Sequence, residues 1–267
     1  MLPASNVVVG ASVQDDSVIP PLEAVLSLEA WRSDRSSRKS TGFAVIDELT
    51  GGFDAGQVWI VTGTPGQGRS TLATQWALRT ASVHDLTTHL ISTREPARLV
   101  GARLLSCAGR VSALRVWNHE LTDSDQPGID QAHELLGAAP LLIAGPSDLS
   151  LLDADLDDGE WPQAVVVDDA DVAAGAFPKR IQSFSARGIL VILTLPRHVV
   201  LTPTGLNPLW SRAADFVIDI RRPDVLDHRS FRPGEADLHV LRNRWGPTRR
   251  ATVAFQGHYA RFVEISR

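Results

Sequence analysis

The chain has 267 residues, a formal net charge of −5, 43% hydrophobic residues and a single cysteine, Cys107. One cysteine excludes an intramolecular disulfide framework, and the acidic balance excludes a surface coated throughout with positive charge, although not a local basic stripe. No apolar run has the length of a membrane span, and the first residues lack the basic-then-apolar pattern of a secretory signal. We therefore expect a cytoplasmic α/β protein.

The beginning of the chain predicts an arm and a linker. Small and polar residues at 1–21 end in two prolines and indicate a flexible arm. Residues 22–31 carry apolar side chains at helical spacing and predict a short amphipathic helix within a linker at 22–39. One domain is expected over residues 40–267. The helix has no core of its own, and the pattern leaves open whether it packs on its own domain or on a neighbouring subunit.

Residues 58–73, V-W-I-V-T-G-T-P-G-Q-G-R-S-T-L-A, hold the clearest chemical signal. Residues 58–61 predict a buried strand and residues 72–79 a helix. The turn between them, residues 63–68, is here called the glycine loop, and the stretch follows the phosphate-binding (P-loop) pattern G-x-x-x-x-G-[KR]-[ST]. Its glycines let backbone N–H groups face one anion, and the helix adds its positive end. The residues expected to bind the phosphates of ATP are Gly63, Thr64, Pro65, Gly66, Gln67, Gly68, Arg69, Ser70 and Thr71.

Two residues of this stretch decide its chemistry. Ser70 is expected to bind Mg²⁺ between the β- and γ-phosphates. Arg69 stands where lysine is preferred, and a planar guanidinium does not replace a compact ammonium at a tight site. Nucleotide binding should therefore survive better than hydrolysis, because the backbone cradle remains. Taken alone, the stretch also fits a glycine-rich turn that binds nothing.

Further elements follow along the chain. The patterns predict strands at residues 88–92, 141–144, 188–195 and 213–220, helices at 96–109 and 177–187, and a helical segment at 111–140 with a break at 126–128. The acidic residues 148–158 indicate a solvated helix or loop. Residues 236–262 predict a β-meander.

A second chemical landmark is the apolar run at residues 164–167, which ends in Asp168 and Asp169. A buried parallel strand presents its carboxyl end to the ligand side of an α/β sheet, so a carboxylate there is placed to hold Mg²⁺. Asp168 is the expected metal ligand and Asp169 the reserve. A helix N-cap is the alternative for an aspartate at a strand end.

Several of these motifs together carry a resemblance to a family. The stretch T-G-F-A-V-I-D-E-L-T-G-G-F-D-A-G-Q that leads into the glycine loop resembles the C-terminal motor domain of DnaB-type replicative helicases. The ending, R-N-R-W-G-P-T and F-Q-G-H-Y-A-R-F, is similar to the K-x-R-x-G-P-T hairpin and F-Q-x-x-x-x-R-F close of that family. The resemblance implies a RecA-like P-loop NTPase fold, with a mostly parallel sheet flanked by helices and a C-terminal antiparallel β-meander. It covers about residues 40–262 and suggests a divergent, stand-alone member.

The resemblance also assigns roles. It places Arg244 on the arginine finger and Arg242 on its partner lysine, which in a ring reach the nucleotide of the adjacent subunit. It implies ATP and Mg²⁺ as cofactors, a homo-oligomeric ring such as a hexamer, single-stranded DNA as substrate and replication proteins as partners. Without the resemblance, the two arginines read as edge-strand charges that discourage aggregation.

Four departures from the family pattern bear on hydrolysis. Besides Arg69, a gapless alignment puts Arg94 where the family carries the glutamate that polarises water, and Glu95 follows one residue late. In the family, one strand ends in a pattern similar to S-Q-L-N-R, whereas residues 194–197 of this chain read T-L-P-R and lack the glutamine. The loops that would face DNA are also short. The general base is either lost or supplied by Glu95.

Two functions are therefore expected. The first is a DnaB-like ATP-dependent helicase or translocase motor with impaired hydrolysis. The second is a non-catalytic relative that acts as a nucleotide-binding or purely structural regulator of a helicase or another DNA-associated assembly.

Overall fold

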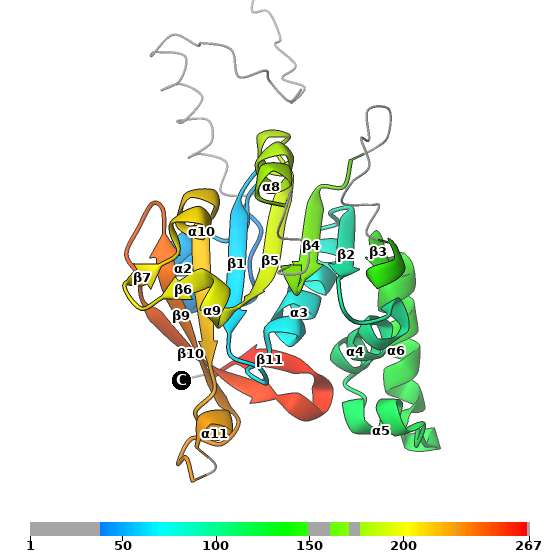
Figure 1. The fold of residues 1–267 in the computed structure, drawn as a ribbon. Helices are drawn as coiled ribbons and strands as arrows, with labels where there is room; N and C mark the ends of the chain where they lie inside the picture. The colour runs from blue at the N-terminus through cyan, green and yellow to red at the C-terminus, as the bar shows by residue number, and fades with distance from the viewer. Residues whose placement is uncertain (1–37, 149–160, 171–176, 228, 266–267) are drawn as a thin grey trace, which may run out of the picture. The chain divides into compact units, whose positions relative to one another are not determined.

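The computed structural model of the chain describes residues 38–148, 161–170, 177–227 and 229–265 (Figure 1). The predicted arm, the predicted helix at 22–31 and most of the acidic stretch lie outside these residues. None of the helices described is both long and apolar enough to cross a membrane.

Within the described residues, nine strands form one sheet in the order β11-β10-β9-β8-β1-β5-β4-β2-β3. The strands from β8 to β3 in this order are parallel, whereas β9, β10 and β11 are antiparallel. The predicted mostly parallel sheet with a C-terminal meander is confirmed. The bounds are β1 Val58–Gly63, β2 Thr88–Ser92, β3 Leu141–Ala144, β4 Ala164–Asp168, β5 Leu190–Pro196, β8 Phe216–Arg221, β9 Glu235–Asn243, β10 Arg250–Gln256 and β11 Arg261–Glu264.

Helices cover both faces of the sheet (Figure 1). The first core, formed with α3 and α4, takes Trp59 and Val61 of β1, whereas the second, formed with α8 and α10, takes Val58 and Ile60. This alternation is what a strand buried on both faces requires. The helices are α2 Ala44–Thr50, α3 Arg69–Ser82, α4 Ala97–Gly109, α5 Ala113–Asn118, α6 Gln126–Ala138, α8 Phe177–Ala186, α9 Arg197–Val200, α10 Pro208–Ala213 and α11 Pro223–Leu226.

Two helix boundaries differ from the sequence patterns. The expected break at residues 126–128 is instead the start of α6, because proline fits the first helical turn, where its missing N–H has no partner to lose. The real break lies earlier, at residues 119–122, and a 3-10 turn at Asp123–Asp125 leads into α6. Helix α3 begins at Arg69, directly after the glycine loop. A small hairpin, β6 (Leu201–Thr202) with β7 (Gly205–Leu206), lies in the short segment after β5.

Strand β9 contains a bulge. Val217 pairs with Arg242, but the next residue, Ile218, pairs with Val240, so Leu241 is an extra residue in β9. A bulge of this kind leaves one residue without a partner and bends the strand.

Candidate functional site

The glycine loop joins the end of β1 to the start of α3. Gly66 and Gly68 have φ values of 81° and 97°, a backbone conformation that glycine adopts without strain. The N–H of Leu72 donates to the carbonyl of Gly68 at 3.0 Å and so begins the helical ladder. The N–H groups of residues 68–71 therefore project from the helix N-terminus, where an anion is favoured.

The loop is held from the side by the residue that follows β8. Gln67 is 1% exposed, and its Oε1 accepts a hydrogen bond from the N–H of Arg222. The Nη1 of Arg222 donates to the carbonyl of Gly66 at 3.3 Å, and the guanidinium lies 3.8 Å from the centre of the Phe255 ring. Arg222 thus fixes the loop while stacking on the C-terminal meander.

The meander also supports the loop through Phe262. A Cβ added to Gly68 would lie 2.7 Å from Cζ of Phe262, so this position has no room for a side chain. Gln75 of α3 holds the backbone of Phe262 with two hydrogen bonds, of 2.8 and 2.9 Å. The F-Q…R-F ending of the chain therefore packs against the glycine loop.

Asp168 ends β4 beside this loop and is 4% exposed. Thr194 Oγ1 donates to its Oδ1 at 2.6 Å. Burial raises the pKa of Asp168, whereas Thr194 and the nearby hydroxyl of Ser70 act in the opposite direction. The structure thus brings together the two expected metal ligands, Ser70 and Asp168.

The donor set fits Mg²⁺. This ion usually takes only one or two protein oxygens, with phosphates and waters completing its shell. Among the described residues, no group of three or more His, Cys, Asp or Glu side chains could hold a metal ion. A cation at Ser70 and Asp168 would therefore depend on oxygen atoms from outside the protein, and it would offset the cost of burying the Asp168 carboxylate.

Asp169, the reserve ligand, points to two arginines. Its Oδ2 lies 2.9 Å from Nη1 of Arg94, and its Oδ1 lies 3.9 Å from Nη2 of Arg69. Its backbone is left-handed, with a φ of 61°. Few residues other than glycine adopt this conformation, and Asn and Asp are the most frequent among them. The arginine of the glycine-loop pattern and the arginine in the place of the general base therefore share one carboxylate.

Glu95 takes a different direction from Arg94. Arg103 of α4 donates to Oε2 of Glu95 at 2.6 Å, and the Glu95 side chain is 39% exposed. The Glu95 carboxylate is close enough to Asp168 to raise its pKa, as a minor contribution. Glu95 thus lies on the Asp168 side of the site, but it is already engaged by Arg103.

A pocket opens beside the glycine loop, between residues 64–69 and the segment after β5. Its volume is about 770 Å³. The wall includes the basic residues Arg69, Arg94, Arg197 and His198. Arg197 also lies 3.3 Å from Asp219, a carboxylate with 0% exposure that contacts Arg221 at 2.8 Å. The wall of the pocket thus carries three guanidinium groups, each of which also faces a carboxylate, Asp169 or Asp219.

Arg242 and Arg244 lie at the other end of the sheet. Strand β9 runs antiparallel to β8, and Asn243 pairs with Phe216 at the start of β8, whereas the glycine loop follows the far end of the parallel strand β1. Arg244 Nη1 lies 3.0 Å from Oδ1 of Asp215 with the side chain 61% exposed, and Arg242 Nε donates to the carbonyl of Ala214 at 2.7 Å. These arginines do not meet the glycine loop of their own chain.

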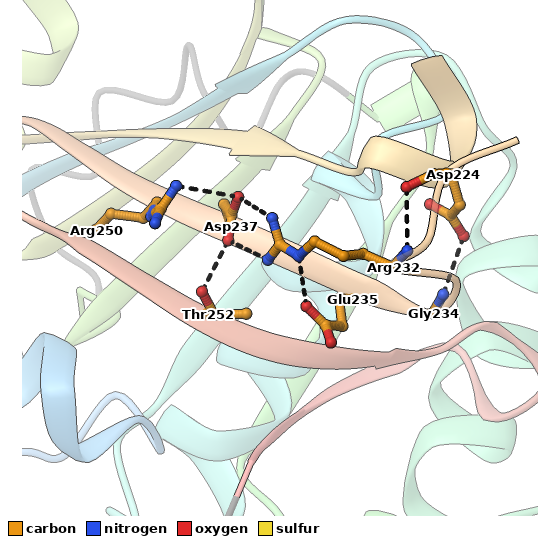
Figure 2. A network of polar contacts seen from close by, with 8 residues as sticks. Asp224, Arg232, Gly234, Glu235, Asp237, Arg250 and Thr252 are labelled. Atoms are coloured by element: carbon orange, nitrogen blue, oxygen red, sulfur yellow. Dashed lines mark hydrogen bonds and ion pairs between the residues drawn. The ribbon is translucent and has the colours of Figure 1, made fainter. Parts of the chain in front are cut away.

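A network of charges holds Arg232 and the residues that lead into β9 (Figure 2). Arg232 binds both carboxylate oxygens of Asp237, at 2.8 and 2.9 Å, and Glu235 at 2.7 Å. Thr252 of β10 donates to Asp237 at 2.8 Å. The network ties the loop that follows Arg222 to the meander.

Comparisons with known proteins agree with this architecture. Residues 39–157 match the family model described as the DnaB-like helicase C-terminal domain. The replicative DNA helicase DnaB of Leifsonia xyli subsp. xyli is 28% identical over 256 residues, covering 85% of this chain and 56% of that protein. The chain spans about half the length of the curated relatives it matches first.

Solved structures share the fold. An ATPase domain of known structure superposes with a TM-score of 0.77 at 16% identity, covering 95% of this chain and 100% of that one. A DnaB-like replicative helicase superposes with a TM-score of 0.73 at 17% identity, covering 94% of this chain and 68% of that one. The fold is thus that of the DnaB-like ATPase domains. Together, the family model, the curated relatives and the fold support a DnaB-like helicase C-terminal domain.

Three features of the site were not predicted from the sequence. They are the hydrogen bond from Arg222 to Gln67, the sharing of Asp169 by two arginines, and the burial of Asp219 in β8. Only Asp219 left a local signal, because a carboxylate within the apolar run F-V-I-D-I needs a partner when it is buried.

Proposed function

We propose that the domain binds Mg-ATP at the glycine loop and serves as an ATP-dependent, DnaB-like helicase or translocase motor with impaired hydrolysis. The observation that carries the proposal is the contact of Ser70 with the buried Asp168, beside the N–H groups at the start of α3. Ser70 and Asp168 would hold Mg²⁺, and residues 63–71 would hold the phosphates. The cation, when bound, neutralises charge on the β- and γ-phosphates.

Slow hydrolysis follows from the residues near the terminal phosphate. Arg94 carries no proton-accepting group, and Glu95, the remaining candidate for a general base, is held by Arg103 at 2.6 Å. A general base contributes roughly 10²- to 10⁴-fold in rate. We therefore expect this domain to hydrolyse ATP more slowly, by a factor in this range, than a motor whose glutamate is free to act as the base.

The motor would be assembled from several chains. Because Arg242 and Arg244 lie at the end of the sheet opposite the glycine loop, they would complete the site of a neighbour. Head-to-tail packing of this kind closes into a ring, and a hexamer is the expected form. Single-stranded DNA would be the substrate. The DnaB-like replicative helicase of known structure interacts with primase, so replication proteins are the proposed partners.

A second function is favoured by the engaged site residues. Asp169 occupies Arg69 and Arg94, and Arg103 occupies Glu95. A domain in this state could bind nucleotide without turning it over and act as a regulator or adaptor of a helicase or another DNA-associated assembly.

ATP binding with and without Mg²⁺ tests the shared part of both proposals. The wild type should bind a fluorescent ATP analogue more tightly in Mg²⁺ than in EDTA, and Asp168→Asn should lose this difference while folding normally. Asp130→Asn, on the exposed side of α6, is the matched charge control. If the wild type binds no nucleotide, the motor and every nucleotide-dependent regulator are refuted.

Turnover separates the two functions. ATPase activity that single-stranded oligothymidylate stimulates and that Arg244→Ala abolishes supports the motor, provided that Arg249→Ala, on the same hairpin, keeps the activity. ATP binding without measurable turnover, with or without DNA, supports the regulator instead. Sedimentation with and without ATP measures the expected ring.

A further inference from the structure

The pocket beside the glycine loop is built for an anion with more than one charge. The described part of its wall contains Arg69, Arg94, Arg197 and His198, and no carboxylate. Two carboxylates contact these arginines from outside the wall: Asp169, 16% exposed, lies 2.9 Å from Arg94, and the buried Asp219 lies 3.3 Å from Arg197. Three guanidinium groups around one opening match the several oxygen atoms of a terminal phosphate, which can accept hydrogen bonds from each of them.

The Arg69 guanidinium is only partly satisfied. The Arg69 side chain is 15% exposed, its Nη1 is buried without a hydrogen-bond partner, and its Nη2 lies 3.9 Å from Asp169, too far for a hydrogen bond. Asp169 Oδ1 is likewise buried without a hydrogen-bond partner. A buried donor without an acceptor is costly, so a phosphate oxygen that reached Arg69 would remove a deficit.

Asp169 is tethered so that only its side chain can move. Its N–H donates to Thr194 Oγ1 at 2.7 Å, and its carbonyl accepts from Thr93 Oγ1 at 2.6 Å. Its carboxylate can therefore turn away from Arg69 and Arg94 while the end of β4 stays in place. Because it bears the same sign of charge as a phosphate, it competes with phosphate for these arginines.

We propose that Arg69, Arg94 and Arg197 clamp the terminal phosphate of a nucleoside triphosphate, and that Asp169 is a built-in competitor that this phosphate displaces. The inference rests on the proposed nucleotide binding and specifies its regulation. In this clamp Arg94, at the position of the general base, binds phosphate oxygens and accepts no proton. The site therefore distinguishes triphosphate from diphosphate without depending on hydrolysis.

Paired titrations with ATP and ADP test the clamp. Arg94→Gln should weaken ATP binding about tenfold, the lower end of what a charge-assisted hydrogen bond contributes, because Arg94 is largely exposed. Asp169→Asn should strengthen ATP binding by a similar factor, since it removes the competing charge and asparagine tolerates the left-handed backbone. ADP affinity should stay within about twofold in both variants. Glu134→Gln, an exposed residue of α6, is the matched control and should change neither affinity.

The possible outcomes separate this inference from the function on which it rests. Wild-type binding of ATP with equal effects of the variants on ATP and ADP, or with no effect on either, overturns the clamp and leaves nucleotide binding intact. Absence of all nucleotide binding overturns both. Oligothymidylate that displaces ATP from the wild type but not from Arg94→Gln would assign the pocket to nucleic-acid phosphates and also overturn the clamp.

Discussion

Replacement of Gly68 by alanine is expected to destabilise the domain more than the same replacement at Gly66. Both residues have positive φ values, 97° and 81°, so alanine suffers a similar backbone strain at each. Their surroundings differ. Among the described residues, a Cβ at Gly66 would meet only Val225 Cγ1, at 3.6 Å, whereas at Gly68 it would lie 2.7 Å from Cζ of Phe262 and 3.3 Å from Cε2 of Phe255.

The difference can be estimated from these contacts. The left-handed conformation costs an alanine about 1–2 kcal/mol at either position. At Gly68 the Phe262 ring cannot retreat, because Gln75 holds its backbone and its ring packs on Phe255 at a centroid distance of 4.9 Å. Overpacking of this kind adds about 1–3 kcal/mol. For a domain of this size the added cost corresponds to a further fall in Tm of about 2–12 °C.

Thermal and urea denaturation of the two single variants measure this difference without any ligand. Equal stability of Gly66→Ala and Gly68→Ala would refute the packing of Phe262 under the loop. A double-mutant cycle gives an independent check: Gly68→Ala should cost less in a Phe262→Leu background, because the smaller side chain makes room for the Cβ. A cost that does not change in that background would contradict the structure.

Three further predictions concern other parts of the domain. Hydrogen bonds from Arg232 lower the pKa of Asp237. The ionised carboxylate therefore stabilises the fold above the usual aspartate pKa, and this stabilisation is lost as the pH falls through the pKa of Asp237 in the folded state. Asp237→Asn should cost about 1 kcal/mol of unfolding free energy at pH 7, and a deficit in urea denaturation that persisted unchanged at pH 2–3 would contradict this. Gly128→Ala should destabilise the domain by at least about 1–3 kcal/mol, because its Cβ would lie 2.4 Å from the carbonyl oxygen of Gly109. Gly137→Ala, which has open space around it, should stabilise α6 by up to about 1 kcal/mol in the same denaturation assay. Burial raises the pKa of Cys107 to about 11, so a thiol reagent at pH 8 should label the unfolded chain much faster than the folded one, and rapid labelling of the folded domain would refute that burial.

Much of the fold was predictable because its signals are local. The apolar runs of β1, β4 and β5 are rich in β-branched residues, and strands alternate with helices along this part of the chain. That repetition favours a parallel sheet flanked by helices. The pairing of Ser70 with Asp168 was also predictable, since the carboxyl ends of parallel strands meet at one edge of the sheet. Whether these residues bind a nucleotide stays a prediction.

The rest of the site depends on contacts between distant segments. Arg222 reaches the carbonyl of Gly66, 156 positions earlier in the chain, and no local pattern specifies such a partner. The left-handed backbone of Asp169 directs its side chain to Arg69, at the start of α3, and to Arg94, which follows β2. Helix start and stop signals also failed where proline lay at 127, because the same residue can end one helix or begin another.

The extra residue in β9 has a consequence for the two C-terminal arginines. Up to Val240, even-numbered residues of β9 such as Leu238 point into the core beside α3. After Leu241 the alternation is inverted, so Arg242 shares a face with Val217, which belongs to the opposite core. Deletion of one residue here would keep every side chain of the motif and still turn the guanidinium of Arg242 towards the layer that contains Trp59. The orientation of this motif thus depends on the number of residues in a single strand, and the identities of the motif's own side chains do not specify it.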